Sequence, residues 1–279
     1  MRGRGRLVLA CGFLALFLYD GVLRTLLASV VTLPVIPGGI NTLTLLLLLF
    51  SLAHSSYALG GRLTLAFFAI TAVVSWTLEE AGVVTGLVFG PYHYTSTLGP
   101  WLGSVPVLIP LAWFMMIYPS YVIANLVIDG RPTGSPGGRG HLAGLALLGA
   151  LVMAAWDLVV DPILSGPVIG AWVWEAGGPY FGIPVHNYAG WIGTTFIVYV
   201  AYRALERQWP PRPAGPMTPG ASVLPVLAYG AMMVSNLLSG STPAALVVIA
   251  PIAMGMPVVA ALIRLLSPGG EADRDAPRG

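Results

Sequence analysis

Two aspartates, Asp157 and Asp161, are the residues whose type and spacing point most clearly to chemistry. They stand at the end of an apolar run long enough to cross a bilayer, where an acidic side chain is costly to desolvate and commonly marks a functional site. Their four-residue spacing puts both side chains on one face of a helix. We therefore predict a functional site built on this pair, suited to acid–base chemistry or proton coupling.

Further acids and several tryptophans accompany the pair. Pro162 disfavours helical geometry at Asp161, so we expect the helix to end there. The segment that follows is rich in Gly, Pro and Trp and suits an interfacial or re-entrant loop. Glu79 and Glu80 form a second acidic pair, and because adjacent helical residues point about 100° apart, at most one of them faces the site. The tryptophans near the aspartates are Trp156, Trp172, Trp174 and Trp191.

A second aromatic segment, residues 85–101, contains Tyr92, His93 and Tyr94. It suits either an aromatic belt at the membrane interface or the mouth of a pocket. His93 and His186 are both expected on the same side of the membrane as the acids. Because the sequence lacks the short His and Glu spacings of typical metal sites, we predict no metal site.

The composition places the chain among membrane proteins. It has 279 residues, of which 56% are hydrophobic and only 9% are charged, whereas soluble domains carry about 25% charged residues. All thirteen basic residues are arginine, and the absence of lysine excludes a retinal Schiff base. The single cysteine, Cys11, excludes an internal disulfide and a cysteine-based metal site. The net charge of +2 comes from scattered residues and does not indicate binding to nucleic acid.

Apolar runs of membrane-spanning length predict an all-α, polytopic protein with about eight transmembrane helices. We expect residues 1–266 to form a single transmembrane domain and residues 267–279 to form a polar, disordered cytoplasmic tail. The predicted spans are Leu7–Val31, Ile40–Leu59, Leu63–Val84, Leu102–Ile128, His141–Val160, Tyr188–Leu205, Ala221–Leu238 and Pro243–Leu266.

The positions of the arginines predict how these spans are oriented in the membrane. Twelve of the thirteen fall at the N-terminus, at alternate connections or after the last span, and the other connections carry no basic residue. By the positive-inside rule, both termini are cytoplasmic, in a multi-pass protein of the cell membrane. The exception, Arg24, is four residues from Asp20, and we expect the two to neutralise each other. On this topology, the acids of the spans all lie near the outer face.

Several ordered motifs cover most of the chain. They are Glu79-Glu80 with Phe89-Gly90-Pro91-Tyr92-His93-Tyr94, the stretch Ile109-Pro110-Leu111-Ala112-Trp113, Trp156-Asp157 with Asp161-Pro162, Trp172-Val173-Trp174, Gly178-Pro179-Tyr180-Phe181-Gly182-Ile183-Pro184, and Asn187 with Gly190-Trp191. Together these motifs resemble the CruF-type carotenoid hydratases, a family that includes carotenoid 1′,2′-hydratases and bisanhydrobacterioruberin hydratases. No Rossmann or P-loop glycine fingerprint accompanies them.

The resemblance implies a cofactor-independent hydro-lyase of carotenoid biosynthesis. It would add water to the terminal isopropylidene double bond of an acyclic carotenoid ψ-end and give a tertiary alcohol. The substrate implied is lycopene, γ-carotene or a C50 precursor, reached within the lipid bilayer. Other enzymes of the carotenoid pathway are candidate partners, and nucleic acid is not.

Such a reaction needs a protonated acid, a base for the attacking water and groups that stabilise a cation. A carboxyl group in an apolar pocket keeps its proton, and a second carboxyl nearby separates the acidities of the two. Asp157 and Asp161 fit this acid and base, with Glu79 and Glu80 as further catalytic candidates. Asn187 could instead cap a helix. The residues predicted to bind the substrate are Trp156, Trp172, Trp174, Trp191, Tyr92, His93, Tyr94, Trp113, Tyr180, His186 and Asn187.

Three other functions remain open at this point. A membrane lycopene cyclase would begin with the same protonation but close a ring, so that its product is an isomer of the substrate. A proton-coupled transporter would also use outer carboxyls, but polar residues would be expected to continue toward the cytoplasmic half. A non-catalytic protein that binds carotenoid or lipid would need the aromatic residues but not the paired acids.

Overall fold

The long apolar runs form helices in the computed structural model, which describes residues 2–267. The predicted tail lies outside the described residues, apart from Ser267. Seven helical runs among those described are long and apolar enough to cross a membrane. They are α1 (Arg2–Leu18) with η1 (Tyr19–Leu23) and α2 (Arg24–Leu27), α3 (Gly39–Ala58), α4 (Gly61–Thr85), α5 (Leu108–Asp129), α6 (Arg139–Leu164), α8 (Pro219–Leu237), and α9 (Leu246–Ala250) with η3 (Pro251–Gly255) and α10 (Met256–Leu266).

An eighth long helix, α7 (Val185–Gln208), has the length of a span but a more polar end. Arg203, Glu206 and Arg207 lie in its last turns, so two arginines expected near a connection belong to the helix itself. The lengths and compositions of these helices confirm the prediction of an all-α, multi-pass membrane protein.

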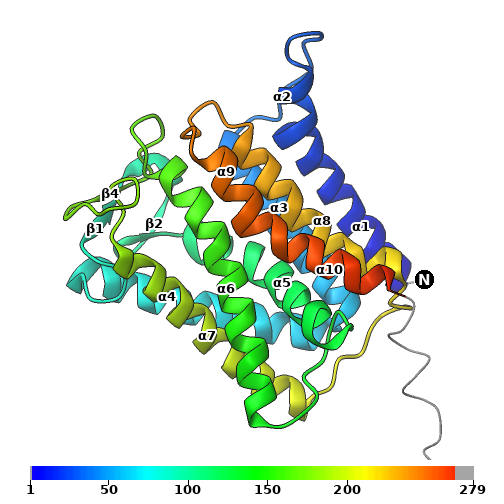
Figure 1. Ribbon diagram of the computed structural model, residues 1–279. Coiled ribbons are helices and arrows are strands. Elements are labelled where there is room, and N and C mark those ends of the chain that lie inside the picture. Colours follow the sequence, from blue (N-terminus) through cyan, green and yellow to red (C-terminus); the bar gives the residue numbers. More distant parts are fainter. Residues whose placement is uncertain (1, 268–279) are drawn as a thin grey trace, which may run out of the picture.

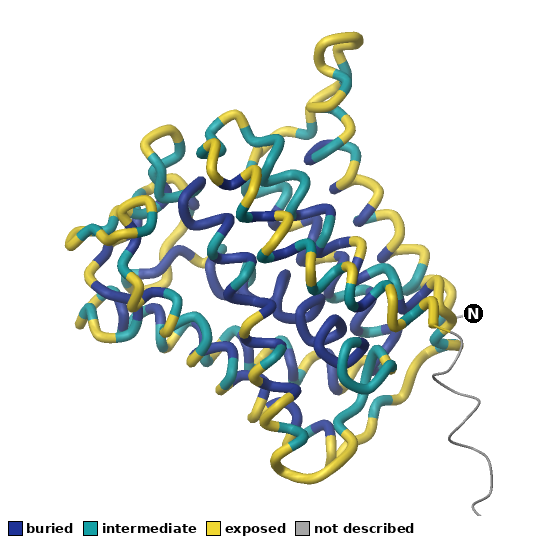
Figure 2. The backbone as a smooth tube through the Cα atoms, in the orientation of Figure 1, coloured by how far each residue is buried: buried dark blue, intermediate teal, exposed yellow. Residues whose placement is uncertain are grey.

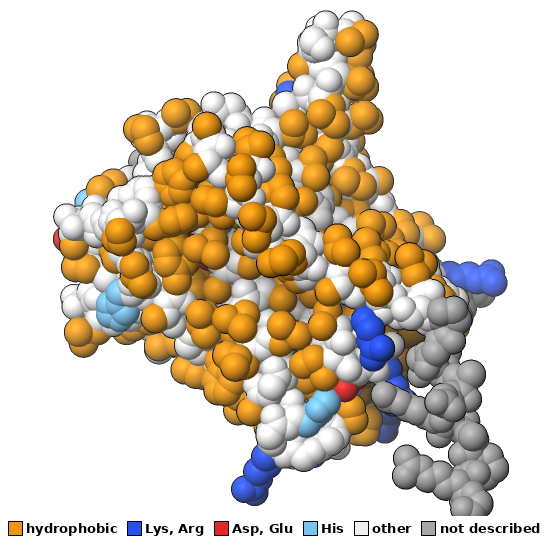
Figure 3. All heavy atoms as spheres, in the orientation of Figure 1, with side chains coloured by type: hydrophobic (Ala, Val, Ile, Leu, Met, Phe, Trp, Pro, Cys, Tyr) orange, Lys and Arg blue, Asp and Glu red, His pale blue; other side chains and the backbone are white. Residues whose placement is uncertain are grey.

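Helix α5 occupies the centre of the bundle, where it packs against α3, α4, α6, α8 and α10 (Figures 1 and 2). Every residue from Trp113 to Leu126 is buried, as expected for a helix that is apolar all round. The outer helices, by contrast, expose apolar side chains such as Val8 and Ile263. In Figure 3 apolar side chains cover most of the visible face, and basic side chains gather mainly toward its lower right. This surface suits contact with lipid, with the charged end at one boundary.

The end of α6 differs from the prediction, because the helix continues through Pro162 to Leu164 instead of ending at Asp161. Pro162 has no backbone N–H, so it cannot donate the usual helical hydrogen bond to the carbonyl of Leu158, four residues earlier. The Tyr180 hydroxyl donates to that carbonyl at 2.8 Å and so replaces the missing bond. A tertiary contact therefore permits the extra turn.

The start of α5 also differs, because the helix begins at Leu108 and not at Leu102. The preceding residues form a small hairpin of β2 (Trp101–Leu102) and β3 (Val105–Pro106). Its turn uses Gly103 with φ +67°, a left-handed conformation that glycine adopts freely. The Glu80 carboxylate accepts the Ser104 backbone N–H at 2.7 Å and holds the turn.

A second ribbon joins the two aromatic segments that the sequence keeps far apart. Strand β1 (Tyr92–Tyr94) pairs antiparallel with β4 (Trp172–Trp174), with Tyr92 opposite Trp174 and Tyr94 opposite Trp172. Alternate residues of a strand face opposite sides, so these four aromatic side chains share one face. His93 lies on the other face and is exposed. The ribbon lies at the end of the bundle where α4 and α6 approach it (Figure 1).

Candidate active site

A cavity of about 340 Å³ lies inside the bundle, bounded by the β1–β4 ribbon and by α4, α5, α6 and α7. Its lining is mainly apolar and aromatic, but three carboxyls converge on it. Glu79 comes from α4 and is 4% exposed, and Asp157 and Asp161 come from α6 and are each 1% exposed. An apolar cavity with a few convergent polar groups is the usual form of a small-molecule site.

One side-chain amide links the two aspartates. Asn187, in the first turn of α7, donates from Nδ2 to Oδ2 of Asp157 and to Oδ2 of Asp161, at 2.8 Å each. Asp161 also accepts at Oδ1 from the indole N–H groups of Trp172, at 2.8 Å, and Trp174, at 3.1 Å. Asp157 has no second side-chain donor among the described residues. Because hydrogen bonds to a carboxylate favour its charged form, Asp161 is the better stabilised anion of the two.

Glu79 has three donors of its own. Trp113 Nε1 donates to Oε1 at 3.0 Å, and Tyr94 donates to Oε2 at 2.8 Å. The Tyr92 hydroxyl also donates to Oε2. Burial, reinforced by the neighbouring Glu79, raises the pKa of Tyr92 and of Tyr94 far above the usual value for tyrosine, so both phenols remain donors at neutral pH.

The tryptophans form an aromatic wall beside the acids. Trp113 and Trp191 stack with ring centroids 4.0 Å apart and planes 13° apart. Trp156 meets Trp191 nearly at right angles, at 5.7 Å. In the β1–β4 ribbon, Tyr92 packs against its cross-strand partner Trp174, with ring centroids 5.0 Å apart. Rings from three helices and both strands of the ribbon therefore line one cavity.

Most of the residues that the sequence singled out line this cavity, and four do not. Glu80 faces the β2–β3 hairpin, one step round α4 from Glu79. His93 is exposed and pairs with Glu175 at 3.0 Å. Tyr180 and His186 also lie outside the lining. The predicted residues that do line the cavity are Glu79, Tyr92, Tyr94, Trp113, Trp156, Asp157, Asp161, Trp172, Trp174, Asn187 and Trp191.

The far end of the cavity includes residues that the sequence did not assign to a site. The predicted ion pair between Asp20 and Arg24 is confirmed at 2.9 Å, and both residues lie on the cavity wall. Phe89 and Asn236 also contribute to the wall. A sequence signal for Asp20 existed, since it is an acid in an apolar run, but its orientation depends on a π-helical turn that no residue pattern predicts.

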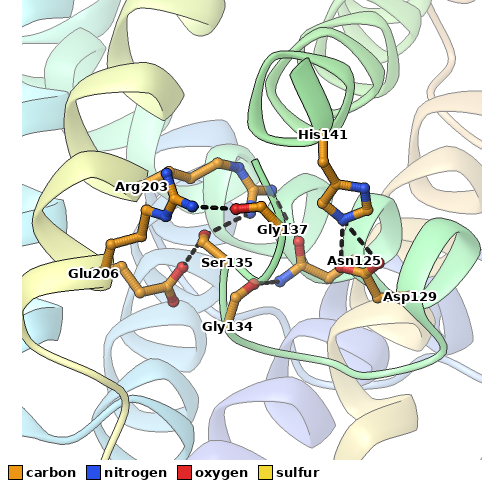
Figure 4. A network of polar contacts seen from close by, with 9 residues as sticks. Asn125, Asp129, Gly134, Ser135, Gly137, His141, Arg203 and Glu206 are labelled. Carbon is orange, nitrogen blue, oxygen red and sulfur yellow. Dashed lines mark hydrogen bonds and ion pairs between the residues drawn. The ribbon is translucent and has the colours of Figure 1, made fainter. Parts of the chain in front are cut away.

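A second buried polar cluster lies at the other end of α7, away from the cavity (Figure 4). Arg203 is fully buried and donates to Asn125 Oδ1 at 2.9 Å and to Ser135 Oγ at 3.1 Å. Ser135 in turn donates to Glu206, which also accepts the Tyr121 hydroxyl at 2.5 Å. The cluster fastens the connection between α5 and α6 to α7, and we assign it a structural role.

Comparisons with known proteins agree with the resemblance seen in the motifs. Residues 40–262 match the family described as carotenoid biosynthesis protein. Over 132 residues the chain is 33% identical to a bisanhydrobacterioruberin hydratase of Haloarcula japonica, a match that covers 47% of this chain and 41% of the relative. No solved structure gives a significant match. Because the family match spans well over half of the sequence, this chain belongs to the carotenoid biosynthesis protein family.

Proposed function

We propose that this protein is a carotenoid hydratase that adds water to the terminal isopropylidene double bond of an acyclic ψ-end. The observation that carries the proposal is the convergence of three buried carboxyls in one aromatic cavity. The family match and the hydratase relative support it. The substrate is an acyclic carotenoid end, as in lycopene, γ-carotene or a C50 precursor, which reaches the cavity from the bilayer.

In this proposal Asp157 is the general acid. It has one side-chain donor, whereas Asp161 and Glu79 each have three, so Asp157 is the carboxyl with the least support for a negative charge. Its proton adds to the less substituted alkene carbon, and the alkene electron pair forms the new C–H bond. The positive charge then rests on the carbon that bears two methyl groups, because alkyl substitution stabilises a cation there.

Asp161 is the general base for the attacking water. The water oxygen bonds to the tertiary cation while one of its protons passes to the Asp161 carboxylate. Asn187 donates to both aspartates and holds their oxygens near one another, so a proton can return from Asp161 to Asp157 and complete the cycle. The net change is the addition of one water, which needs no oxidant, reductant or redox cofactor.

The cation is stabilised by the aromatic wall and by Glu79. Each tryptophan face attracts a cation by about 0.5–2 kcal/mol, and the stacked pair of Trp113 and Trp191 presents such faces. In this proposal Glu79 acts as a carboxylate, the form that its donors Tyr92, Tyr94 and Trp113 favour and its burial opposes, and it adds a negative charge in a medium of low dielectric. Both features act more strongly on the cation than on the neutral substrate, as catalysis requires.

We also propose that both termini are cytoplasmic and that the cavity lies in the outer half of the cell membrane. The alternation of the arginines supports this orientation.

Expression in a lycopene-accumulating host, followed by mass analysis of the pigments, tests the proposed function. The expected product carries the added mass of one water per reacted end. An isomeric ring product would instead favour a cyclase, and unchanged pigment in cells that contain the folded protein would refute the hydratase.

A further inference from the structure

The cavity extends beyond the three carboxyls to a second end with different chemistry. This end lies where three segments meet, namely the last turns of the first span, the start of α3 and the end of α8. In contrast to the aromatic wall, it carries an ion pair, an amide and several hydroxyls. The polar side chains that line it are Asp20, Arg24, Thr25, Thr44, Ser235, Asn236 and Ser239.

A π-helical turn, η1, orients part of this lining. Within Tyr19–Leu23, Asp20 and Gly21 are the buried residues. Single π-helical turns within longer helices are rare and frequently mark functional sites. At Gly21 the first span comes so close to α8 that a Cβ atom there would lie 2.9 Å from Ser235 Oγ. The turn therefore brings Asp20 to the cavity at a point where the two helices nearly touch.

The polar groups here reach from the interior to the surface of the protein. Asp20 is 3% exposed and accepts at Oδ1 from Arg24 Nε, whose side chain is 32% exposed. The same oxygen accepts the backbone N–H of Ile36, in the connection before α3, at 3.2 Å. Asn236 Nδ2 is buried and has no partner among the described residues. Buried donors of this kind are normally paired with ordered water.

We propose that this end of the cavity is the water inlet of the active site. The inference rests on the proposed hydratase function. A hydrocarbon ψ-end has no group that an ion pair or an amide could bind, whereas water can pair with each of them. The apolar side of the cavity, which includes Leu98, Ile163 and Ile169, suits the polyene. A bound polyene fills its own route, so water needs another one.

A separate water inlet would determine which of two reactions the cation undergoes. After protonation, the cation either bonds to a water oxygen or loses a proton to a base such as Asp161 and returns to an alkene. Water delivered along the polar lining favours the first outcome. In D₂O the second outcome returns a deuterium-labelled alkene, so the ratio of labelled alkene to alcohol reports how well water reaches the cation.

The test compares purified wild-type protein with Asn236→Leu, which keeps the side-chain size but removes the amide, and with Ser235→Val. Thr71→Val, on α4 and outside the cavity lining, is the matched control. With a ψ-end carotenoid in D₂O, we expect the inlet variants to raise the ratio of labelled alkene to alcohol about tenfold. This change corresponds to about 1.4 kcal/mol in the difference between the barriers for proton loss and for water addition. The control should leave the ratio unchanged.

An unchanged ratio of labelled alkene to alcohol in both variants, at whatever total rate, would indicate that water reaches the cation by another route and would overturn the inlet. If the wild-type protein forms alcohol and the variants keep the wild-type ratio, the inlet is refuted but the hydratase proposal stands. A wild-type protein that forms neither alcohol nor labelled alkene removes the hydratase proposal as well.

Discussion

Replacing Asp157 with asparagine removes the proposed proton while changing little else. The two side chains have nearly the same size and shape. Asp157 makes one side-chain hydrogen bond, from Asn187 Nδ2 at 2.8 Å, and the amide oxygen of an asparagine can accept that bond in its place. We therefore expect Asp157→Asn to fold, to enter the membrane and to keep the cavity intact.

The expected loss of activity is large. Positioned acid–base catalysis contributes roughly 10²- to 10⁴-fold, which corresponds to about 2.7–5.5 kcal/mol of activation free energy. Asp161→Asn should differ in a second respect, because its two oxygens accept from three donors. An amide oxygen can still accept from both indoles, but the amide nitrogen then faces the donor Nδ2 of Asn187. We expect that conflict to lower stability by about 1–3 kcal/mol in addition to the loss of activity.

The assay measures initial rates of alcohol formation by each variant in the same membrane preparation, with the amount of folded protein and its thermal unfolding followed in parallel. Asp157→Asn should lose activity at an unchanged midpoint of unfolding, and Asp161→Asn should lose both. If Asp157→Asn keeps a rate within about threefold of wild type, well inside the loss expected for an acid–base residue, the proton donor lies elsewhere. Glu79 would then be the next candidate.

The remaining predictions concern the mechanism, the cation and the topology. Reaction in ¹⁸O-labelled water should put the label in the new hydroxyl, and reaction in D₂O should put one deuterium on the neighbouring carbon; oxygen derived from O₂ would exclude a hydratase. Trp156→Leu and Trp174→Leu should lower the yield of alcohol and release isomeric alkenes, and a full yield from both would argue against cation stabilisation by these rings. Reporter fusions after Arg139 and Arg212 should be active in the cytoplasm and fusions near Gly178 should behave as external, whereas a cytoplasmic signal at Gly178 would contradict the orientation.

The helical bundle could be predicted from the sequence because one physical requirement dominates inside a membrane. An apolar run of about 20 residues must form a helix to satisfy its backbone. The errors arose where a distant side chain replaced a local hydrogen bond. Tyr180 supplies the donor that Pro162 lacks, and Glu80 holds the turn that delays α5. Neither contact can be predicted from the local sequence, because Tyr180 is 22 residues from Leu158 and Glu80 is 24 residues from Ser104.

The site was predictable in part for a similar reason. The spacing of Asp157 and Asp161 determines that they share a helix face, so their proximity could be read directly. The choice between Glu79 and Glu80 depends on how α4 is rotated against its neighbours, which spacing alone does not define. The sequence grouped His93 with Tyr92 and Tyr94 because nothing local showed that these residues form a strand. The strand depends on pairing with β4, about 80 residues later, and in a strand His93 faces the side opposite to the two tyrosines.

The β1–β4 ribbon explains why three similar carboxyls can have different roles. It supplies Tyr92 and Tyr94 to Glu79 and supplies Trp172 and Trp174 to Asp161, but it gives no donor to Asp157. All four donors share one face only in the observed register, with Tyr92 opposite Trp174. A slip of one residue in either strand would turn its aromatic donors away from the cavity and leave a carboxyl without them. The register of two three-residue strands thus separates the two carboxyls that receive donors from the ribbon from Asp157, which we propose as the proton donor.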